Sequence, residues 1–172
     1  YERRWAIGKW HLGHYRRKYL PPNRGFTHFY GHYNGMFDYF THKREGELDW
    51  HRNFDTCRDE GYSTDLIGRE AVRFIEESTA GKPLFLYVPV NAPHTPLQAK
   101  PEDIAKYDTM ENPKQRIYAA MVDSMDQAVG KVLGASVENA DVLDEDLGRL
   151  LLLRNRLQIG GADKHEKRGD DG

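Results

Sequence analysis

A continuous apolar run near the middle of the chain, from Pro83 to Val88, constrains the fold more than any other feature. Six consecutive residues without a charge predict a strand that is buried on both faces of a sheet, because such runs are typical of strands covered by helices. Gly81 precedes the run and Pro89 follows it, so turn-forming residues bound it on both sides. The sequence therefore predicts a short strand in a layered fold.

One helix is predicted before this strand in the sequence and another after it. Ser63, Thr64 and Asp65 commonly begin helices, and Gly81 commonly ends one. The apolar residues between them recur at helical spacing, at Ile67, Ala71, Phe74 and Ile75. After the strand, a second helix is predicted with a single apolar stripe of Tyr118, Met121, Val122, Met125, Val129 and Val132.

Another strand-like segment lies near the start of the sequence. The apolar stretch Trp5–Ile7 stops at Gly8, which predicts a buried strand that leads into a loop. From His11 to Trp50 no period is sustained, so a long loop is expected there. Strand, helix, strand, loop and helix in this order predict an α/β fold. Ligands in such sheets bind beyond the carboxyl ends of the strands, which makes the loops after Ile7 and Val88 the candidate site.

Composition excludes several classes of protein. The 172 residues are 38% hydrophobic and 30% charged, with a formal net charge of −2, so the whole chain lacks the basic excess of a nucleic-acid-binding protein. The longest apolar run, Leu150 to Leu153, is too short to span a bilayer. The one cysteine, Cys57, has no internal disulfide partner. The sequence opens without a methionine or a signal peptide, which is expected of a piece of a longer protein.

The candidate chemistry centres on Gly8-Lys9-Trp10-His11-Leu12-Gly13. If the chain stays extended after the first strand, Lys9 and His11 lie two residues apart and point to one face. Lysine supplies a point charge suited to a sulfate or phosphate oxygen, and histidine donates a hydrogen bond or moves a proton near neutral pH. From the residues alone, a solvated Lys9 and a turn-capping His11 stay an alternative.

This motif resembles the second signature of the type I sulfatases, and Pro93-His94-Thr95-Pro96-Leu97 resembles their next active-site segment. Tyr62-Ser63-Thr64-Asp65 and Met121-Val122-Asp123-Ser124-Met125-Asp126 match the family in order and spacing. The resemblance runs from about Trp5 to Leu133 and is strongest to the arylsulfatase B (N-acetylgalactosamine-4-sulfatase) type. It implies an alkaline-phosphatase-like core, with a mixed central sheet flanked by helices, present here as an internal fragment.

The resemblance also implies a mechanism. Such sulfatases use a hydrated formylglycine as the nucleophile and a divalent cation, usually Ca²⁺, that holds the sulfate. By this likeness Lys9 bridges the nucleophile and a sulfate oxygen, and His11 hydrogen-bonds the formylglycine hydroxyl. His94 binds sulfate and protonates the leaving oxygen. The implied substrate is a sulfated carbohydrate or an aryl sulfate, and the implied location is secreted, periplasmic or lysosomal.

The sequence departs from the family at two functional motifs. The Cys-x-Pro-x-Arg nucleophile motif is absent, and Cys57 stands in the wrong context and on the wrong side of Lys9. Where the family has Asp-Asn-Gly, this chain has Arg154-Asn155-Arg156, so Asn155 is the only candidate metal ligand and is flanked by repelling cations. We therefore divide the chain into residues 1–133, the central part of the catalytic domain, and residues 134–172, a degraded or frame-shifted continuation. The chain by itself is expected to be inactive.

Two alternatives to a sulfuric ester hydrolase stay open. One is a phosphate-ester hydrolase of the same superfamily, which the sulfatase-like motif around Lys9 disfavours. The other is a non-catalytic remnant that binds anionic glycans. The cluster Arg16-Arg17-Lys18 and the tyrosines beside it resemble a nucleic-acid or glycan patch, although a solvated basic loop is the more common explanation; beside a sulfatase site they suit a sulfated sugar.

Overall fold

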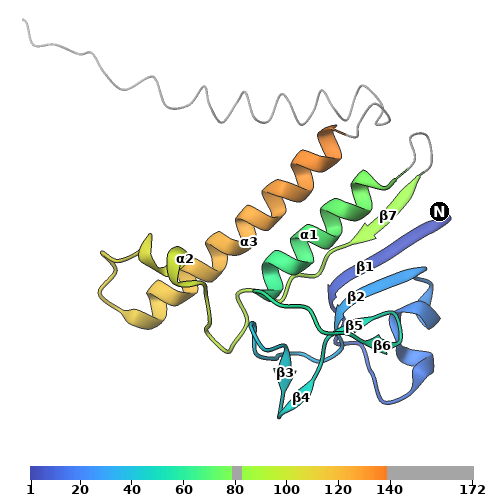
Figure 1. Ribbon diagram of the computed structural model, residues 1–172, viewed down its shortest axis with the longest axis horizontal. Helices are drawn as coiled ribbons and strands as arrows, with labels where there is room; N and C mark the ends of the chain where they lie inside the picture. Colours follow the sequence, from blue (N-terminus) through green and yellow to red (C-terminus); the bar gives the residue numbers. More distant parts are fainter. Residues whose placement is uncertain (79–82, 139–172) are drawn as a thin grey trace, which may run out of the picture.

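The computed structural model describes residues 1–78 and 83–138, and its centre is a five-stranded mixed sheet (Figure 1). The strand order is β6-β5-β2-β1-β7. The bounds are β1 Arg3–Lys9, β2 His28–His32, β5 His51–Arg52, β6 Asp55–Thr56 and β7 Leu84–Tyr87. β2 and β7 both run parallel to β1, whereas β5 and β6 join antiparallel beyond β2. The mixed sheet of the predicted fold class is confirmed.

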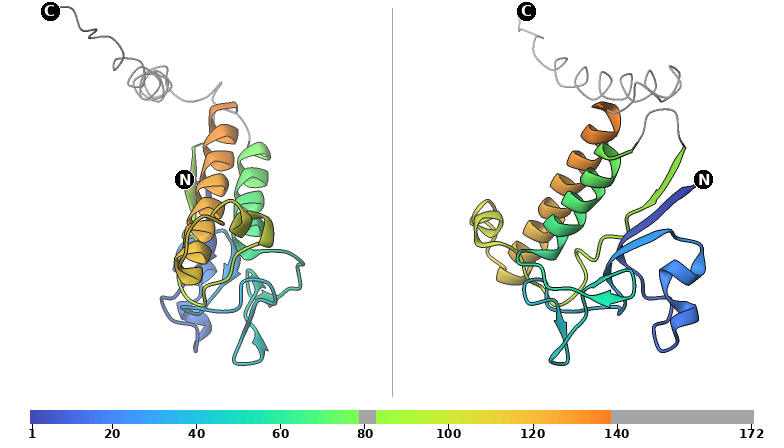
Figure 2. Two further views of the ribbon diagram at one scale, coloured as in Figure 1. Left: turned by 90° about the vertical axis from the view of Figure 1, so that its left-hand side faces the viewer. Right: turned by 45° about the vertical axis from the view of Figure 1, so that its right-hand side comes forward.

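Two long helices form layers on one side of this sheet (Figures 1 and 2). Their bounds, with those of the shorter elements, are α1 Ser63–Glu76, α2 Pro101–Ala105, α3 Pro113–Glu138, η1 Arg17–Tyr19, η2 Pro21–Arg24, β3 Lys43–Arg44 and β4 Glu47–Leu48. α1 begins at the residues that the sequence predicted, and α3 packs on α1. In the described part of the chain, no helix is long and apolar enough to cross a membrane.

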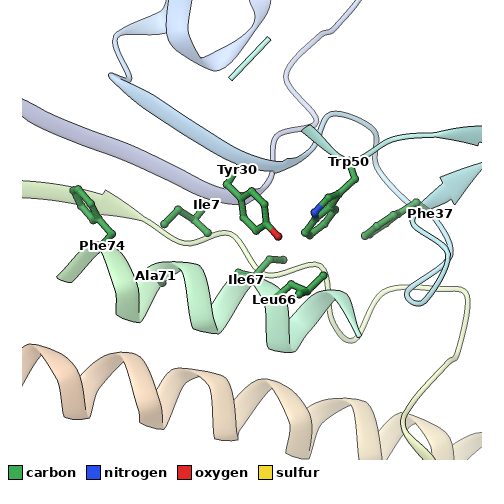
Figure 3. Packing of buried hydrophobic residues seen from close by; sticks show 8 residues of the cluster. All are labelled: Ile7, Tyr30, Phe37, Trp50, Leu66, Ile67, Ala71 and Phe74. Carbon is green, nitrogen blue, oxygen red and sulfur yellow. The ribbon is translucent and has the colours of Figure 1, made fainter. Parts of the chain in front are cut away.

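The main core lies between α1 and the sheet (Figure 3). Ile7 of β1 and Phe74 of α1 are fully buried there, and the Trp5 and Phe74 rings stack with their centroids 3.7 Å apart. Because side chains alternate along a strand, Ala6 faces the opposite side of the sheet. There it packs in a second cluster with Trp10 and Phe29, beneath the segment that carries η1 and η2. Burial of apolar surface on both faces holds the strands in place.

Two predictions about these elements are wrong, and a third is only partly right. β7 is not buried on both faces: Leu84 and Leu86 pack on the core, but Phe85 and Tyr87 are 46% and 42% exposed. The rings of Phe85 and Tyr87 contact that of Phe26, at centroid distances of 6.2 and 6.3 Å. Phe26 lies at the end of the segment with η1 and η2 that covers this face of the sheet. Within the described residues β7 pairs with β1 alone, so its outer edge has no covering neighbour.

The expected loop from His11 to Trp50 contains β2 and the hairpin of β3 and β4. The strand β2 was missed because its sequence, His-Phe-Tyr-Gly-His, mixes polar with aromatic residues although four of its five residues are buried.

The predicted stripe of α3 is only partly buried: Met121 is buried, and Met125 and Val132 pack against the hydrophobic clusters. Tyr118 and Val129 are 48% and 44% exposed, whereas Ala120, Met121 and Ala128 are buried. The reason is the close crossing with α1: a Cβ placed on Gly68 would lie 3.0 Å from the Cβ of Ala128. Small residues therefore face α1, because larger ones would hold the two helices apart.

The structure describes only the first five residues after the predicted boundary at residue 134. α3 continues through Gly134 to Glu138, and Ala135 is 8% exposed. Residues 139–172 lie outside the described residues, so the division at residue 134 stays a prediction.

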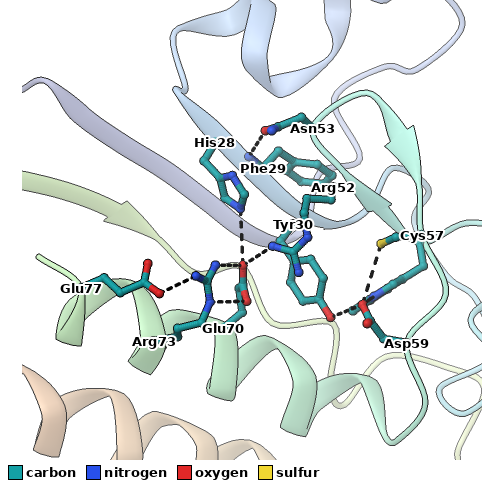
Figure 4. A network of polar contacts seen from close by, with 11 residues as sticks. His28, Phe29, Tyr30, Arg52, Asn53, Cys57, Asp59, Glu70, Arg73 and Glu77 are labelled. Atoms are coloured by element: carbon teal, nitrogen blue, oxygen red, sulfur yellow. Dashed lines mark hydrogen bonds and ion pairs between the residues drawn. The ribbon is translucent and has the colours of Figure 1, made fainter.

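A buried carboxylate between α1 and the sheet joins this helix to two strands (Figure 4). Glu70 of α1 accepts hydrogen bonds from Arg73 at 2.7 and 3.0 Å and from Arg52 of β5, and its Oε1 lies 3.5 Å from Nε2 of His28 of β2. The side chain of Glu70 is 8% exposed. Burial alone would raise its pKa, but the bonds from His28, Arg73 and Arg52 hold the pKa of Glu70 well below its usual range.

We expect Glu70→Gln to lower the free energy of unfolding by about 3 kcal/mol, because the cations around a buried carboxylate lose their partner. Glu77→Gln is the control: Glu77 also pairs with Arg73, but its side chain is 49% exposed, so a loss of about 0.5 kcal/mol or less is expected. Urea unfolding followed by circular dichroism measures both. Equal effects of the two variants would contradict the role given to Glu70.

The contribution of Glu70 to the free energy of unfolding falls as the pH is lowered. Because the pKa of folded Glu70 lies below the unfolded value of about 4.3, its contribution to stability is present above that pH and is lost as the pH falls further. The stability difference between the wild type and Glu70→Gln should therefore shrink below about pH 4.

Candidate active site

The first candidate segment lies where β1 meets the chain that leaves β7. The backbone N–H of Lys9 donates to the carbonyl of Pro89 at 2.7 Å. Gly8 makes this approach possible: a Cβ there would lie 2.3 Å from the Pro89 oxygen, and the residue has a φ of +132°. The loops after β1 and β7 therefore start side by side, as parallel neighbouring strands require.

The chain does not stay extended from Lys9 to His11, so the condition for the predicted alternation is not met. β1 ends at Lys9, and His11 has a left-handed φ of +48°. Backbone bonds still hold this turn against the end of β2, because the N–H of Trp10 donates to His32 at 2.9 Å and that of His11 to Tyr33 at 3.0 Å. The ring of His11 is thus oriented by a turn and not by a strand.

That ring rests directly on Gly35. A Cβ on Gly35 would lie 2.6 Å from Cε1 and 2.7 Å from Nε2 of His11, which is closer than van der Waals contact allows. The backbone below the ring is fixed by Asp49, which is 5% exposed. Its carboxylate accepts from the backbone of Tyr33 at 3.0 Å, and from the backbone and side chain of Asn34 at 3.0 and 2.9 Å. We call Tyr33, Asn34 and Gly35 the His11 floor.

The charge of Asp49 is stabilised by these contacts. Burial alone would raise its pKa, but hydrogen bonds from His51, Tyr33 and Asn34 hold the pKa of Asp49 below its usual range. Because its pKa is lowered, Asp49 is ionised at neutral pH. An ionised carboxylate accepts several hydrogen bonds at once, so it holds the His11 floor in place.

The second candidate segment places His94 in an exposed loop after β7. Its Nδ1 lies 2.7 Å from the carbonyl of Thr95, which can only accept, so Nδ1 carries the proton and Nε2 is left for other partners. The carbonyl of His94 accepts from the hydroxyl of Tyr39 at 2.8 Å. The side-chain oxygen of Gln98 accepts from the Tyr39 backbone at 2.9 Å. The backbone of this loop is therefore held while the imidazole stays accessible.

Two buried polar side chains at this end of the sheet have no hydrogen-bond partner among the described residues. His32, the register partner of Lys9, is completely buried, and neither ring nitrogen is bonded. Asn91, three residues before His94, is 3% exposed, and neither amide atom is bonded. Buried polar atoms are rarely left unpaired, so both mark this end of the sheet as a place where further groups are needed.

Burial shifts the pKa of two basic side chains at this end of the sheet. Burial lowers the pKa of His32 to about 3, with Asp49 opposing and Lys9 and His11 lowering it further, so His32 is neutral at physiological pH. Burial also lowers the pKa of Lys9. That the side chains of Lys9, His11 and His94 converge on one sulfate group stays a prediction.

Cys57 has no feature of a nucleophile. Burial, together with the neighbouring Asp59, raises the pKa of its thiol to about 11, so the reactive thiolate is scarce at neutral pH. The Asp59 carboxylate is also engaged by the hydroxyl of Tyr30 at 2.7 Å and the indole of Trp50 at 3.2 Å.

The described residues do not fit a calcium ion. Among residues 1–78 and 83–138 no three His, Cys, Asp or Glu side chains are placed to hold a metal, and the predicted site residues Lys9, His11 and His94 offer no oxygen ligand. The predicted ligand Asn155 lies outside the described residues.

Sequence reasoning missed four residues of this region: His32, Gly35, Asp49 and Asn91. His32, Gly35 and Asp49 lie between His11 and Trp50, where the sequence predicts a long loop. The signal that could have found His32 is the β-prone aromatic pair Phe29-Tyr30, since a strand there places His32 beside Lys9. Nothing in the sequence shows that Gly35 lies under a ring, because that contact joins residues 24 positions apart.

The loops that carry Lys9 and His94 leave the carboxyl ends of two parallel neighbouring strands, where ligands bind in α/β sheets. The Sulfatase family model matches residues 3–141, so the chain belongs to the sulfatase family, and the predicted family is confirmed.

Individual relatives agree with this assignment. Mouse arylsulfatase J is 36% identical over 134 residues, which cover 73% of this chain and 22% of that protein. Human N-acetylgalactosamine-6-sulfatase is 27% identical over 139 residues, covering 74% of this chain and 25% of that protein. The crystal structure of Ps i-CgsB in complex with k-i-k-neocarrahexaose superposes with a TM-score of 0.74 at 34% identity, covering 80% of this chain and 34% of the other. The chain thus spans only a part of the length of these relatives.

We expect Gly35→Ala to displace the His11 ring, because the added methyl occupies the space of Cε1 and Nε2. The measurement is the NMR resonances of the His11 imidazole, which should shift in this variant. Gly130→Ala in α3 is the matched control, since a Cβ there meets nothing within 4 Å. Unchanged His11 resonances in Gly35→Ala would contradict the floor.

Proposed function

We propose that the protein to which this chain belongs hydrolyses sulfate esters, and that Lys9, His11 and His94 bind and orient the sulfate group. The observation that carries the proposal is the bond from the Lys9 N–H to the Pro89 carbonyl, because it brings the two loops with these residues together at one end of the sheet. Family membership supports the same chemistry.

Each side chain has a role that its surroundings favour. Lys9, the register partner of the neutral His32, supplies positive charge to a sulfate oxygen, and none of the ion pairs among the described residues engages it. Nε2 of His94 is left open by the Nδ1 bond, so a protonated His94 can donate to the ester oxygen that leaves. Protonation matters because an alkoxide is a poor leaving group, and a positioned acid removes that barrier. His11, held on its floor, orients the attacking hydroxyl.

The attacking hydroxyl belongs, in this proposal, to a formylglycine. The 172 residues contain no Cys-x-Pro-x-Arg or Ser-x-Pro-x-Arg motif, so we place that residue elsewhere in the protein. Calcium is the proposed metal, which would neutralise sulfate charge, with ligands other than the described residues. A secreted, periplasmic or lysosomal location belongs to the same proposal.

The proposed substrate is a sulfated carbohydrate or an aryl sulfate. Ps i-CgsB, 34% identical over the matched part, was crystallised with k-i-k-neocarrahexaose, and two relatives are named for N-acetylgalactosamine-6-sulfate esters or arylsulfates. These names support an ester of a hydroxyl on a ring, as the exposed position of His94 permits.

Titration of the 172-residue chain with inorganic sulfate and with 4-nitrophenyl sulfate tests the site without requiring turnover. We expect the imidazole resonances of both His11 and His94 to shift together, and Lys9→Ala to weaken binding about tenfold, as loss of a charged contact implies. Lys114→Ala removes an exposed lysine of α3 and should change nothing. If only one histidine responds, or if phosphate binds much more tightly than sulfate, the proposal is contradicted.

Turnover by the 172-residue chain is a separate prediction. With 4-nitrophenyl sulfate and added calcium we expect no product above background, because covalent catalysis needs a nucleophile that this sequence lacks. Product formation that disappears in Lys9→Ala would show that the chain is a working enzyme and would refute this expectation.

A further inference from the structure

Positive charge is concentrated in one segment of the chain. From Arg3 to Phe37 there are seven Lys and Arg residues and no Asp or Glu, although the whole chain has a formal net charge of −2. The segment contains Lys9 and His11 of the candidate site and continues into η1 and η2. Between His11 and Phe37 the Lys and Arg residues are Arg16, Arg17, Lys18 and Arg24.

The segment with η1 and η2, which carries these cations, lies on the side of the sheet away from α1 and α3 (Figure 2). All four are exposed. None of the ion pairs formed within the described residues involves any of them, so their charge is not neutralised by a carboxylate of this part of the chain. A surface of unpaired cations attracts anions from solution.

The backbone that carries them is fixed. The indole N–H of Trp10 donates to the carbonyl of Tyr19 at 3.0 Å, and the side-chain amide of Asn23 donates to the carbonyl of Arg17 at 2.8 Å. The guanidinium of Arg17 lies 4.1 Å from the centroid of the Phe54 ring. Because the segment is already ordered, an anion that binds there has little backbone entropy to overcome.

An aromatic ring stands beside the cations. Tyr15 is 92% exposed, and one face of its ring stacks on His14 with centroids 4.6 Å apart. The other face is open to a flat, weakly polar partner such as a sugar ring. Tyr15 follows His11 by four positions, so their Cα atoms lie within about 14 Å of each other.

We infer that Tyr15, Arg16 and Lys18 form a second anion subsite, which binds a sulfate group on a neighbouring sugar of a polysulfated glycan. The inference rests on the proposed function: the ester to be cleaved is held by Lys9, His11 and His94, and the next part of the same chain lies along η1. Binding energy from this remote sulfate selects polymeric, multiply sulfated substrates over small monosulfated ones.

A glycan fits this surface better than a nucleic acid does. Single-stranded nucleic acids bind through successive bases stacked on several rings. Here one face of Tyr15 is already occupied by His14, which leaves a single open face between cations. A sulfated sugar needs one such face and cations that accept separate anionic groups.

Binding measurements on the 172-residue chain test the subsite. The probes are a sulfated carrageenan hexasaccharide, its desulfated form, 4-nitrophenyl sulfate, and a single-stranded oligothymidylate with the same number of charges as the hexasaccharide. The loop variant is Arg16→Ala with Lys18→Ala, and a second variant is Tyr15→Ala. The matched control is Arg69→Ala with Lys114→Ala, which removes two exposed cations from α1 and α3 and gives the same net charge.

We expect the loop variant to bind the sulfated hexasaccharide about tenfold more weakly at low salt, and the control to bind it as the wild type does. The difference should disappear near 1 M salt, where charges are screened beyond about 3 Å. Tyr15→Ala should weaken binding at every salt concentration. Binding of 4-nitrophenyl sulfate should stay unchanged in the loop variant and fall in Lys9→Ala.

Two results would overturn the inference. One is an equal effect of the loop variant and the control on the hexasaccharide. The other is an oligothymidylate that binds as tightly as the hexasaccharide and loses the same affinity in the loop variant, which would show a general polyanion surface. If Lys9→Ala leaves 4-nitrophenyl sulfate binding unchanged while the loop variant loses the hexasaccharide, the subsite is supported and the failure belongs to the proposed function.

Discussion

The contact on which the rest of the site depends is the close approach of Gly8 to Pro89. A side chain at residue 8 would meet the Pro89 carbonyl at 2.3 Å, so only glycine lets the ends of β1 and β7 meet. The bond from Lys9 that closes this contact fixes where both following loops begin. Two segments that are some eighty residues apart in the sequence thereby present their histidines at the same end of the sheet.

Rigidity behind the site complements this contact. Glu70 gathers side chains from β2, β5 and α1 around one buried carboxylate, and Asp49 does the same for the turn under His11. Both carboxylates are almost fully engaged by donors. In contrast, His32 and Asn91 have buried polar atoms without partners. Buried polar atoms without partners are rare, so these two side chains are where an added group would satisfy most.

Local signals in the sequence predicted those elements that local energetics decide. α1 was predictable because helix-start residues precede a regular apolar period. β7 was found, but not the exposure of Phe85, since exposure depends on which neighbours cover the strand. For the site, resemblance supplied Lys9, His11 and His94, whereas Gly35 could not be predicted. Its importance comes from a long-range contact with a ring, and such contacts leave no period or composition in the chain.

The segregation of charge along the chain has a consequence for the speed of encounter. The segment from Arg3 to Phe37 has no carboxylate, whereas the described parts of α1, α2 and α3 and their connections have more carboxylates than cations. The molecule is therefore polarised across its sheet, with the positive side at β1, η1 and η2. A polarised surface turns an approaching polyanion before contact, so it raises the association rate more than the lifetime of the complex. Capture by this protein would accordingly be fast in dilute salt and much slower in seawater-like salt, even where the final complex is equally well packed.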